Sequence, residues 1–406
     1  MTKIRHKTKK YTERQSALVD VAIRLINRQG VNRLTLIDVA EDMGLGPKSV
    51  AYYFKKKEDL AAASFLRGLE LFQNLVQECE AEPSPAQRIT CLFDIYFEFK
   101  RRAAVGQGGD LISPNDIRAL NSAKVNEAYI TLFRQVRGLF EQPDRSNLTK
   151  LALNARSHLV IAELNWTPAW LRNVFPEEYS RVGARAADIL LNGMAAPGST
   201  WSPLPLSLHE IMPDQSNDSA SESFLRAATK LINEQGYDGA SVEKISAVLS
   251  LSKGAFYHHI KTKDELIMAC FDRTFDFLQR AIIAAESIDG NGLQRLQTLA
   301  FFLVQLQVSG KSVILGPAAV TTLPVALQAN PLGDFDRIAL RLSGVISDGI
   351  TDGSIRAVDP NVAANMFIGM VNMSSELSFF VPGISLDQAI DHYVLPSFSG
   401  GICSYS

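Results

Sequence analysis

The sequence predicts an all-α protein built from two similar units, and three observations support this fold class. Apolar residues recur at three- and four-residue spacing along most of the chain, while strand patterns are sparse. Residues 18–60 and 224–266 match without a gap at a constant offset of 206 residues. A length of 406 residues predicts two or three domains, and the repeat offset places the main division near residue 200. Each half is therefore long enough to bury its own core.

Many residues are identical between the two copies of the repeat. The identical pairs include Ala22 and Ala228, Leu25-Ile26-Asn27 and Leu231-Ile232-Asn233, Gln29-Gly30 and Gln235-Gly236, Leu45 and Leu251, Lys55 and Lys261, Lys57 and Lys263, and Leu60 and Leu266. A repeat of this kind predicts two copies of one structural unit.

The first copy reads as a chain of short helices. Spacing of apolar residues predicts a helix over 13–29, which Gly30 can end with a positive φ. Thr35 and Asp38 form a capping box for a second helix over 36–43, and a turn at 44–46 precedes a third helix over 47–53. A long amphipathic helix follows over 57–80. Helix, short helix, three-residue turn and helix make a helix-turn-helix pattern.

The second copy repeats this order. Its expected helices cover 223–235, 242–249, 253–259 and 263–286, with Ser241 in the capping position. Most helix-turn-helix proteins must dimerise to present two such units to DNA. This chain would carry both.

The motif around the third helix resembles the signature of the TetR (tetracycline-repressor-like) family. The second copy matches it closely over 252–266 (SKGAFYHHIKTKDEL), and the first copy over 46–60 (GPKSVAYYFKKKEDL) is similar to a common variant. The resemblance implies, for each half, a three-helix DNA-binding head and a divergent helical body that binds a ligand and packs on a partner. The expected domains are an arm and first head at 1–62, a first body at 63–195, a linker at 196–218, a second head at 219–268 and a second body at 269–406.

The resemblance also assigns DNA-binding residues. They open the second helix, open the third helix, lie near its end, or open the fourth helix. In the first copy they are Thr35, Pro47, Lys48, Ser49, Tyr52, Tyr53 and Lys57, and in the second Ser241, Lys253, Gly254, Ala255, Tyr257, His258, His259 and Lys263.

Several of these residues have a second interpretation. Tyr52 or His258 could simply be packed, while Val50, Phe54, Phe256 and Ile260 are expected in the core of the heads. Adjacent helical residues diverge by about 100°, which argues against His258 and His259 as a metal pair.

Charge is distributed unequally between the heads. The whole chain has a net charge of -2, but residues 1–60 hold thirteen Lys and Arg against seven Asp and Glu, whereas residues 216–266 hold six against seven. The basic arm at 3–10 has no counterpart before the second head, and it either contacts DNA or is a solubilising tail.

The helical bodies offer aromatic and sulfur-containing residues that belong either to the core or to a ligand pocket. These candidates are Phe93, Tyr96, Phe97, Trp166, Trp170, Phe301, Phe302, Phe367 and Met370. Few charged residues accompany them, so a small hydrophobic effector is expected.

Other classes of function are disfavoured. The four cysteines lie far apart without metal-ligand spacing, and no catalytic triad, P-loop or G-x-G-x-x-G motif is present. We therefore expect no enzyme activity, no cofactor and no metal. No apolar run long enough to span a membrane occurs, and a reduced, cytoplasmic, nucleoid-associated bacterial protein is expected.

The sequence is thus interpreted as a ligand-responsive transcriptional repressor that binds double-stranded DNA. The resemblance implies that the last two helices of each half, at 147–165 with 177–193 and at 359–380 with 386–396, pack together as an intramolecular pseudo-dimer with heads about 34–36 Å apart. Further homodimerisation would give four heads. The alternative is a small-molecule-binding or protein-interaction module in which one or both heads no longer bind DNA.

Overall fold

The fold is all-helical, as expected. The computed structural model describes residues 9–113, 117, 120, 122–142, 148–211, 220–235, 241, 244–245, 247, 262–310 and 314–404. In these ranges the only bridge pairing joins Ala195 to Ile355, at the junction of the two units. No helix in this part of the chain is both long enough and apolar enough to cross a membrane.

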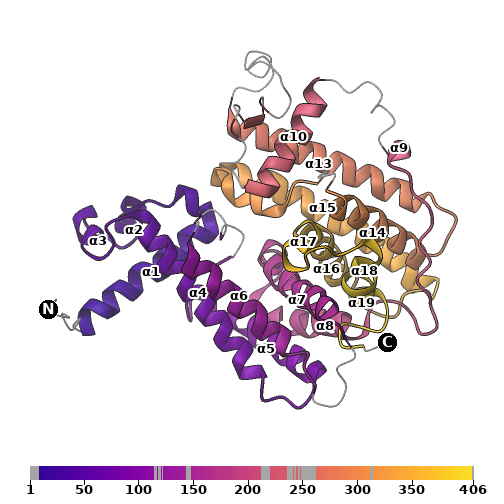
Figure 1. Ribbon diagram of the computed structural model, residues 1–406, viewed down its shortest axis with the longest axis horizontal. Coiled ribbons are helices and arrows are strands. Elements are labelled where there is room, and N and C mark those ends of the chain that lie inside the picture. Colours follow the sequence, from indigo (N-terminus) through magenta and orange to yellow (C-terminus); the bar gives the residue numbers. More distant parts are fainter. Residues whose placement is uncertain are drawn as a thin grey trace.

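The first unit projects its head away from the rest of the molecule (Figure 1). The head contains α1 (Lys9–Gln29), η1 (Val31–Arg33), α2 (Leu36–Asp42) and α3 (Pro47–Tyr53). The first body contains α4 (Lys57–Cys79), α5 (Pro85–Ala104), α6 (Ala123–Gly138), α7 (Lys150–Leu171), η3 (Pro176–Glu178) and α8 (Tyr179–Asn192). Helix α1 begins four residues earlier than expected, and α2 and α4 each end one residue earlier.

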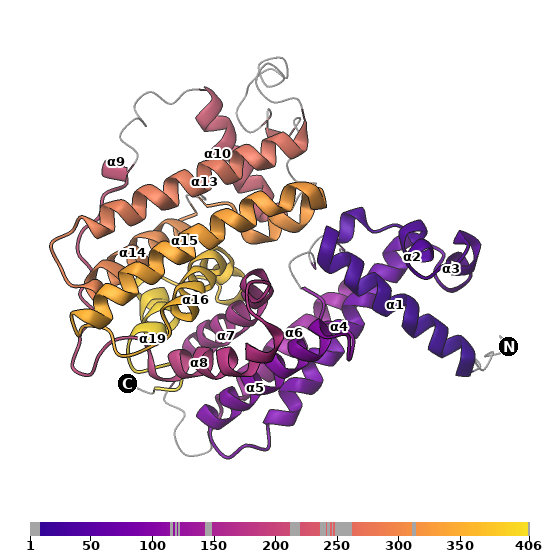
Figure 2. The ribbon, with the colours of Figure 1, turned by 180° about the vertical axis from the view of Figure 1, so that it is seen from behind.

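The second unit lies against the first body (Figures 1 and 2). Its described elements are α9 (Leu208–Ile211), α10 (Ala220–Gln235), α13 (Lys263–Glu286), α14 (Gly292–Val308), η6 (Pro317–Thr322), α15 (Val325–Thr351), α16 (Pro360–Met373), η7 (Ser374–Glu376), α17 (Leu377–Phe380), α18 (Leu386–Ala389), η8 (Ile390–Val394) and α19 (Leu395–Phe398). Helices α10 and α13 correspond to α1 and α4. The expected second and third helices of this head lie largely outside the described residues.

The two units share one hydrophobic core, and its centre is the packing of α7 and α8 on α16, η8 and α19. Helix α7 buries residues all around its axis, and the four consecutive residues 159–162 are each at most 1% exposed. A helix that is buried on every side lies inside a larger core, so it separates two packed layers. Residues from both sequence halves supply those layers.

Close approach of α7 and α16 depends on Gly369. A Cβ at this position would lie 3.0 Å from the Oε2 of Glu163 and 3.0 Å from the Cδ1 of Trp166. Real Cβ atoms seldom come this close to a neighbour, so the absent side chain lets α7 pack tightly on α16.

Polar contacts also connect the two units. Arg172 forms an ion pair with Asp336 at 2.6 Å, Arg356 forms one with Asp188 at 2.8 Å, and Arg185 pairs with Asp359. These contacts fix the relative position of the units within one chain.

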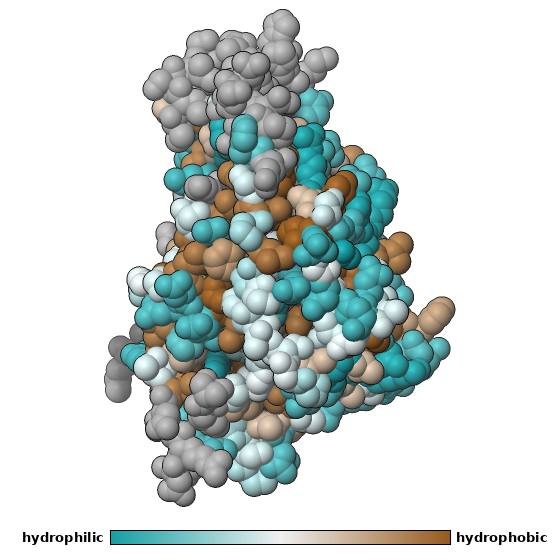
Figure 3. Space-filling view, turned by 90° about the vertical axis from the view of Figure 1, so that its right-hand side faces the viewer, coloured by the Kyte–Doolittle hydropathy of each residue, from teal (hydrophilic) through white to brown (hydrophobic). Residues whose placement is uncertain are grey.

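The expected linker is not a free connection over its first part. The backbone N–H of Ser202 donates to the Oε1 of Gln297, that of Leu204 donates to the Oγ1 of Thr298, and the Trp201 ring contacts Phe398 at 5.3 Å between centroids. The linker therefore lies against the second body up to α9. On the face seen in Figure 3, apolar and hydrophilic residues are interspersed, and no single apolar expanse covers the coloured part of it.

Candidate nucleic-acid interface and ligand pocket

Local sequence signals build the turn of the first helix-turn-helix. Thr35 caps α2, because its Oγ1 accepts a hydrogen bond of 3.0 Å from the N–H of Asp38. Gly44 has a φ of 63° and ends α2, with the Gly44 N–H donating to Glu41 and the Leu45 N–H donating to Ala40. This pair of bonds is a Schellman motif, which turns the chain sharply toward α3.

Helix α3 has one buried side and one exposed side. Val50 is fully buried and Phe54, just after the helix, is 5% exposed, as expected for core residues. Pro47, Lys48 and Ser49 are all exposed at the amino-terminal end of the helix. The structure therefore leaves the three residues that the family motif assigns to DNA accessible at the same end of one helix.

Three tyrosines form a cluster between α1 and the end of α3. Tyr52 is 68% exposed, so the packed interpretation of this residue is wrong for its side chain. Tyr53 is half-buried, and the Tyr11 ring lies 5.9 Å from Tyr52 and 4.8 Å from Tyr53 between centroids. Sequence reasoning missed Tyr11, because it placed the start of α1 after this residue. Extending the apolar spacing one turn toward the N-terminus would have found it.

The lysine that opens α4 has a structural partner. Lys57 donates from its Nζ to the backbone oxygen of Asn32 at 3.1 Å, which ties α4 to η1. Its neighbours Lys55 and Lys56 are exposed. The lysine run therefore divides between a residue that holds the head together and two that are accessible to phosphate.

The second head is described only in part. Ser241 caps the following segment as Thr35 does, since its Oγ accepts from the N–H of Lys244 at 3.2 Å. Lys263 opens α13. The remaining predicted contacts of this head lie outside the described residues: Lys253, Gly254, Ala255, Tyr257, His258 and His259.

The repeated Asn residues have the same role in both units. The Nδ2 of Asn27 donates to the Leu111 oxygen at 2.8 Å, and its Oδ1 accepts from the Ser113 N–H at 2.8 Å. In the second unit Asn233 bonds the Ile314 oxygen and the Gly316 N–H, both at 2.8 Å. Each amide thus joins the first helix of its unit to a loop of its body, which explains why both copies of the repeat retain it.

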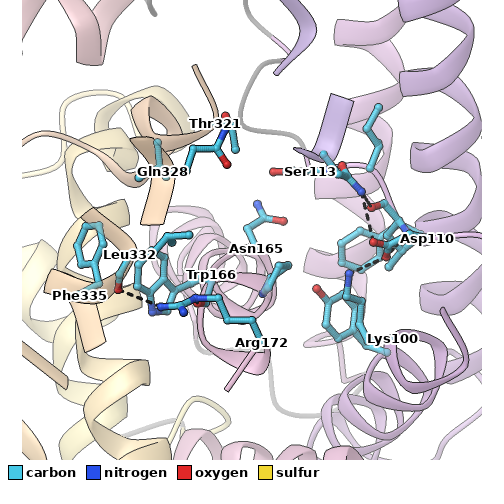
Figure 4. A pocket seen from close by; sticks show the side chains of 18 residues that line it. Lys100, Asp110, Ser113, Asn165, Trp166, Arg172, Thr321, Gln328, Leu332 and Phe335 are labelled. Atoms are coloured by element: carbon cyan, nitrogen blue, oxygen red, sulfur yellow. Dashed lines mark hydrogen bonds and ion pairs between the residues drawn. The ribbon is translucent and has the colours of Figure 1, made fainter. Parts of the chain in front are cut away.

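A cavity of about 310 Å³ lies next to the Asn27 contact, between the two units (Figure 4). Its lining comes from α1, α4, α5, the loop at 110–113, α7, η6 and α15. Gly68 on α4 allows that loop to approach, because a Cβ there would come within 2.2 Å of Ile112. A volume of this size suits a small organic ligand.

Only two of the nine predicted pocket residues line this cavity. They are Tyr96, whose hydroxyl donates to the Leu164 oxygen at 2.6 Å, and Trp166. Burial, with a smaller contribution from the charge of Asp110, raises the pKa of the Tyr96 phenol, so this hydroxyl stays protonated.

The other predicted pocket residues lie elsewhere. Phe93, Phe97 and Trp170 pack into the core of the first body. In the second unit Phe302 packs on Phe277, and Phe301 lies at the edge of the core. Phe367 and Met370 are buried residues of α16. Phe367 also lines an apolar space of only about 20 Å³. For these seven residues the core assignment is therefore correct, and the pocket assignment is wrong.

The second unit has a smaller and more polar cavity of about 200 Å³ beside Asn233. Its lining includes Lys230, Gln307 and Glu376. Because both repeat Asn residues border a cavity, the cavities occupy corresponding places, but their size and chemistry differ. Within the described residues, no cluster of three His, Cys, Asp or Glu side chains could hold a metal ion.

These features define a helix-turn-helix DNA-binding protein with a ligand-sized cavity. The family model of bacterial regulatory proteins of the tetR family matches residues 18–64 and 224–270. The chain belongs to the TetR family and contains two of its DNA-binding segments. It is a TetR-family DNA-binding transcriptional regulator and not an enzyme.

Two curated relatives match over comparable lengths. The chain is 26% identical over 149 residues to the Transposon Tn10 TetC protein of Escherichia coli, covering 36% of this chain and 74% of that protein. It is 25% identical over 151 residues to the HTH-type transcriptional repressor DhaR of Mycobacterium sp. (strain GP1), covering 36% and 76%. Among solved structures, apo AibR matches with a TM-score of 0.35 and 24% identity, covering 44% of this chain and 98% of that one.

Proposed function

We propose that one chain does the work of a TetR-type dimer, as a ligand-responsive repressor whose two unlike heads read one DNA site. The observation that carries this proposal is the packing of α7 and α8 of the first unit on α16, η8 and α19 of the second. In an ordinary homodimer of this family, the corresponding helices would come from two polypeptides.

The first head supplies the stronger DNA contacts in this proposal. It exposes Pro47, Lys48, Ser49 and Tyr52, and it carries the positive charge of the N-terminal region. Charge-assisted contacts to phosphate dominate the affinity of such heads for DNA, while base contacts at the start of the recognition helix select the sequence.

The two heads read different half-sites because the segments expected to form their third helices differ in sequence. At corresponding positions the first copy has Pro47-Lys48-Ser49 and the second has Lys253-Gly254-Ala255. A helix with different side chains at its start contacts different base edges, so the operator is an imperfect palindrome or a pair of unlike half-sites.

Selection of duplexes from fragmented genomic DNA tests the proposal. The full chain is compared with Lys48→Ala/Tyr52→Ala and with Lys253→Ala/Tyr257→Ala, and Lys124→Ala on the exposed side of α6 controls for loss of one positive charge. We expect each double variant to lose a different half of one enriched site, and the control to select the full site.

The stoichiometry of the complex tests the single-chain arrangement. Sedimentation of the protein with the selected duplex is expected to give one chain per site. Two chains per site would show that four heads are used, and enrichment of no sequence would refute the regulator function itself. Loss of selection only in the first double variant would show that the second head does not read DNA.

A further inference from the structure

The 310 Å³ cavity is built from both units, and its walls differ (Figure 4). One wall comes from the first unit and carries Lys100, Asp110 and Ser113. The facing wall comes from η6 and α15 of the second unit, and α7 contributes residues between the two. A molecule in this space therefore contacts both halves of the chain at once.

The charged residues of the cavity are already paired. Lys100 lies 2.6 Å from Asp110, and Arg172 lies 2.6 Å from Asp336. An anionic ligand would have to compete with a carboxylate that each cation already contacts, and a cationic ligand would meet the same obstacle at Asp110, the aspartate that lines the cavity. The lining therefore favours a molecule without a net charge.

Apolar and amide groups supply the remaining contacts. Phe72, Trp166, Leu332 and Phe335 offer ring and aliphatic surface. Asn165 projects its amide into the space between the walls, as Figure 4 shows, and it is half-buried. Such a lining suits a largely apolar molecule that has one hydrogen-bonding group.

Two side chains of this lining also make contacts at the carboxyl-terminal end of α1, the first helix of the first head. Asn27 on α1 bonds the loop at 110–113, as described above. Gln328 on α15 donates from its Nε2 to the backbone oxygen of Arg28 at 3.0 Å and to that of Leu323 at 3.0 Å. Arg28 lies in the last turn of α1, where carbonyl groups have no partner within the helix. The second unit thus satisfies a carbonyl of the first head, through a side chain that borders the cavity.

A second contact joins the same regions. Arg33 in η1 of the first head forms an ion pair with Asp264 at the start of α13, at 3.3 Å. This ion pair is a second link between the first head and the second unit. Asn233, the repeat counterpart of Asn27, is not part of the lining of this cavity.

We propose that this cavity binds one uncharged, largely apolar molecule per chain, and that the molecule displaces the Gln328 amide from the Arg28 carbonyl and so releases the first head. This inference rests on the proposed function, and it names the regulation of the first head. Binding at a site shared by two units shifts the position of the head only if the ligand prefers the released arrangement. In the released arrangement the Gln328 amide no longer bonds Arg28, so the ligand can take its place, and the ligand therefore binds that arrangement more tightly.

The test compares two probes with one skeleton. N-phenyl-1-naphthylamine is uncharged, and 1-anilinonaphthalene-8-sulfonate adds one negative charge. We expect the full chain to bind one equivalent of the uncharged probe, followed by its fluorescence, at least about tenfold more tightly than the anionic one. Equal affinities, or tighter binding of the anion, would overturn the assignment of ligand class.

Two variants separate the site from its effect. Ala169→Phe fills the cavity from α7 and is expected to weaken binding of the uncharged probe at least about tenfold. Gln328→Met keeps the size of the side chain but cannot donate to Arg28, so the probe no longer has to break that bond and is expected to bind a few-fold more tightly than to the parent protein. Unchanged binding in Ala169→Phe would place the probe elsewhere.

Amide hydrogen exchange measures how firmly α1 of the first head is held, and it needs no DNA. With the uncharged probe bound, amides at 21–29 of α1 are expected to exchange at least about tenfold faster, and those at 227–233 of α10 to stay unchanged. In Gln328→Met the α1 amides are expected to exchange fast with or without the probe. Unchanged α1 exchange on binding would refute the coupling. Failure of DNA selection without any probe would instead refute the proposed function, so the two failures are distinguishable.

Discussion

The carboxyl group of Glu163 is buried where the two units meet, and its replacement by Gln tests how that interface tolerates charge. Glu163 lies on α7, is 4% exposed, and faces Gly369 of α16. Its Oε1 has no hydrogen-bond partner in the described part of the chain. Burial raises the pKa of this carboxyl well above its usual range, so the folded protein holds it protonated at pH values where the unfolded chain is ionised.

The direction of the pH dependence follows from this shift. An unfolded Glu releases its proton near pH 4.3, whereas folded Glu163 keeps it to a higher pH. Between these two pKa values the folded state binds one more proton, so the free energy of unfolding falls by about 1.4 kcal/mol for each pH unit. The stabilising effect is complete below the unfolded pKa and is lost as the pH rises to the folded pKa.

Glu163→Gln removes this proton and keeps the shape of the side chain. The variant is expected to match the parent protein near pH 4.5 and to become more stable than it by about 1.4 kcal/mol per pH unit above that. For a chain of this length, unfolding as one unit, this corresponds to about 2 °C per pH unit in melting temperature.

Differential scanning calorimetry from pH 5 to pH 8 measures the difference between the two proteins. Both proteins contain the same other titratable groups, and Tyr393, whose phenol pKa burial raises, stays protonated in both over this pH range, so the difference isolates position 163. A difference that stays constant or shrinks with rising pH would show that Glu163 is ionised in the folded protein.

Three further predictions concern the head, the unit interface and the repeated Asn. Tyr11→Ala is expected to weaken binding to a selected duplex about three- to tenfold, because it removes about 1 kcal/mol of ring packing on Tyr52. Tyr11→Phe keeps the ring and is expected to retain the affinity, and a fluorescence anisotropy titration measures both variants. Gly369→Ala is expected to destabilise the chain by about 1–3 kcal/mol in urea unfolding. The control Gly344→Ala places a Cβ where no atom lies within 4 Å, so it is expected to be neutral or stabilising. Equal effects of the two substitutions would contradict the close approach of α7 and α16. Asn233→Leu leaves two backbone groups unpaired and is expected to lower the free energy of unfolding by about 1–3 kcal/mol. Probe binding in the 310 Å³ cavity is expected to stay unchanged, because Asn233 does not line that cavity, and weakened probe binding would contradict the separation of the two cavities.

The first head could be predicted in detail because its signals are local. Thr35 caps α2, Gly44 ends it and Pro47 begins α3, and each of these roles depends on a few neighbouring residues. Hydrophobic spacing then distinguished buried Val50 from its exposed neighbours. The packing of the last helices of each half was likewise expected, because the resemblance to the TetR family implied it.

The cavity could not be predicted, because residues far apart in sequence form it. Gln328 and Asn27 lie 301 positions apart, and nothing in the periodicity of α15 indicates that it contacts the end of α1. Aromatic spacing predicted the core instead, since a buried helix and a pocket wall have the same apolar pattern. The contact of Lys57 with Asn32 escaped prediction for a related reason: a charge run does not show which lysine a nearby carbonyl will bind.

Covalent fusion explains why the two units differ where a homodimer could not. In a symmetric dimer every contact occurs twice, so a residue that holds one head holds both. Here Gln328 of the second unit bonds Arg28 of the first, and the two cavities differ in volume at about 310 and 200 Å³. The Asn contact that supports the loop in each unit is retained in both, whereas the basic charge is concentrated on the first head alone. What both units need to fold is therefore shared, whereas the cavities and the charge of the two heads have diverged.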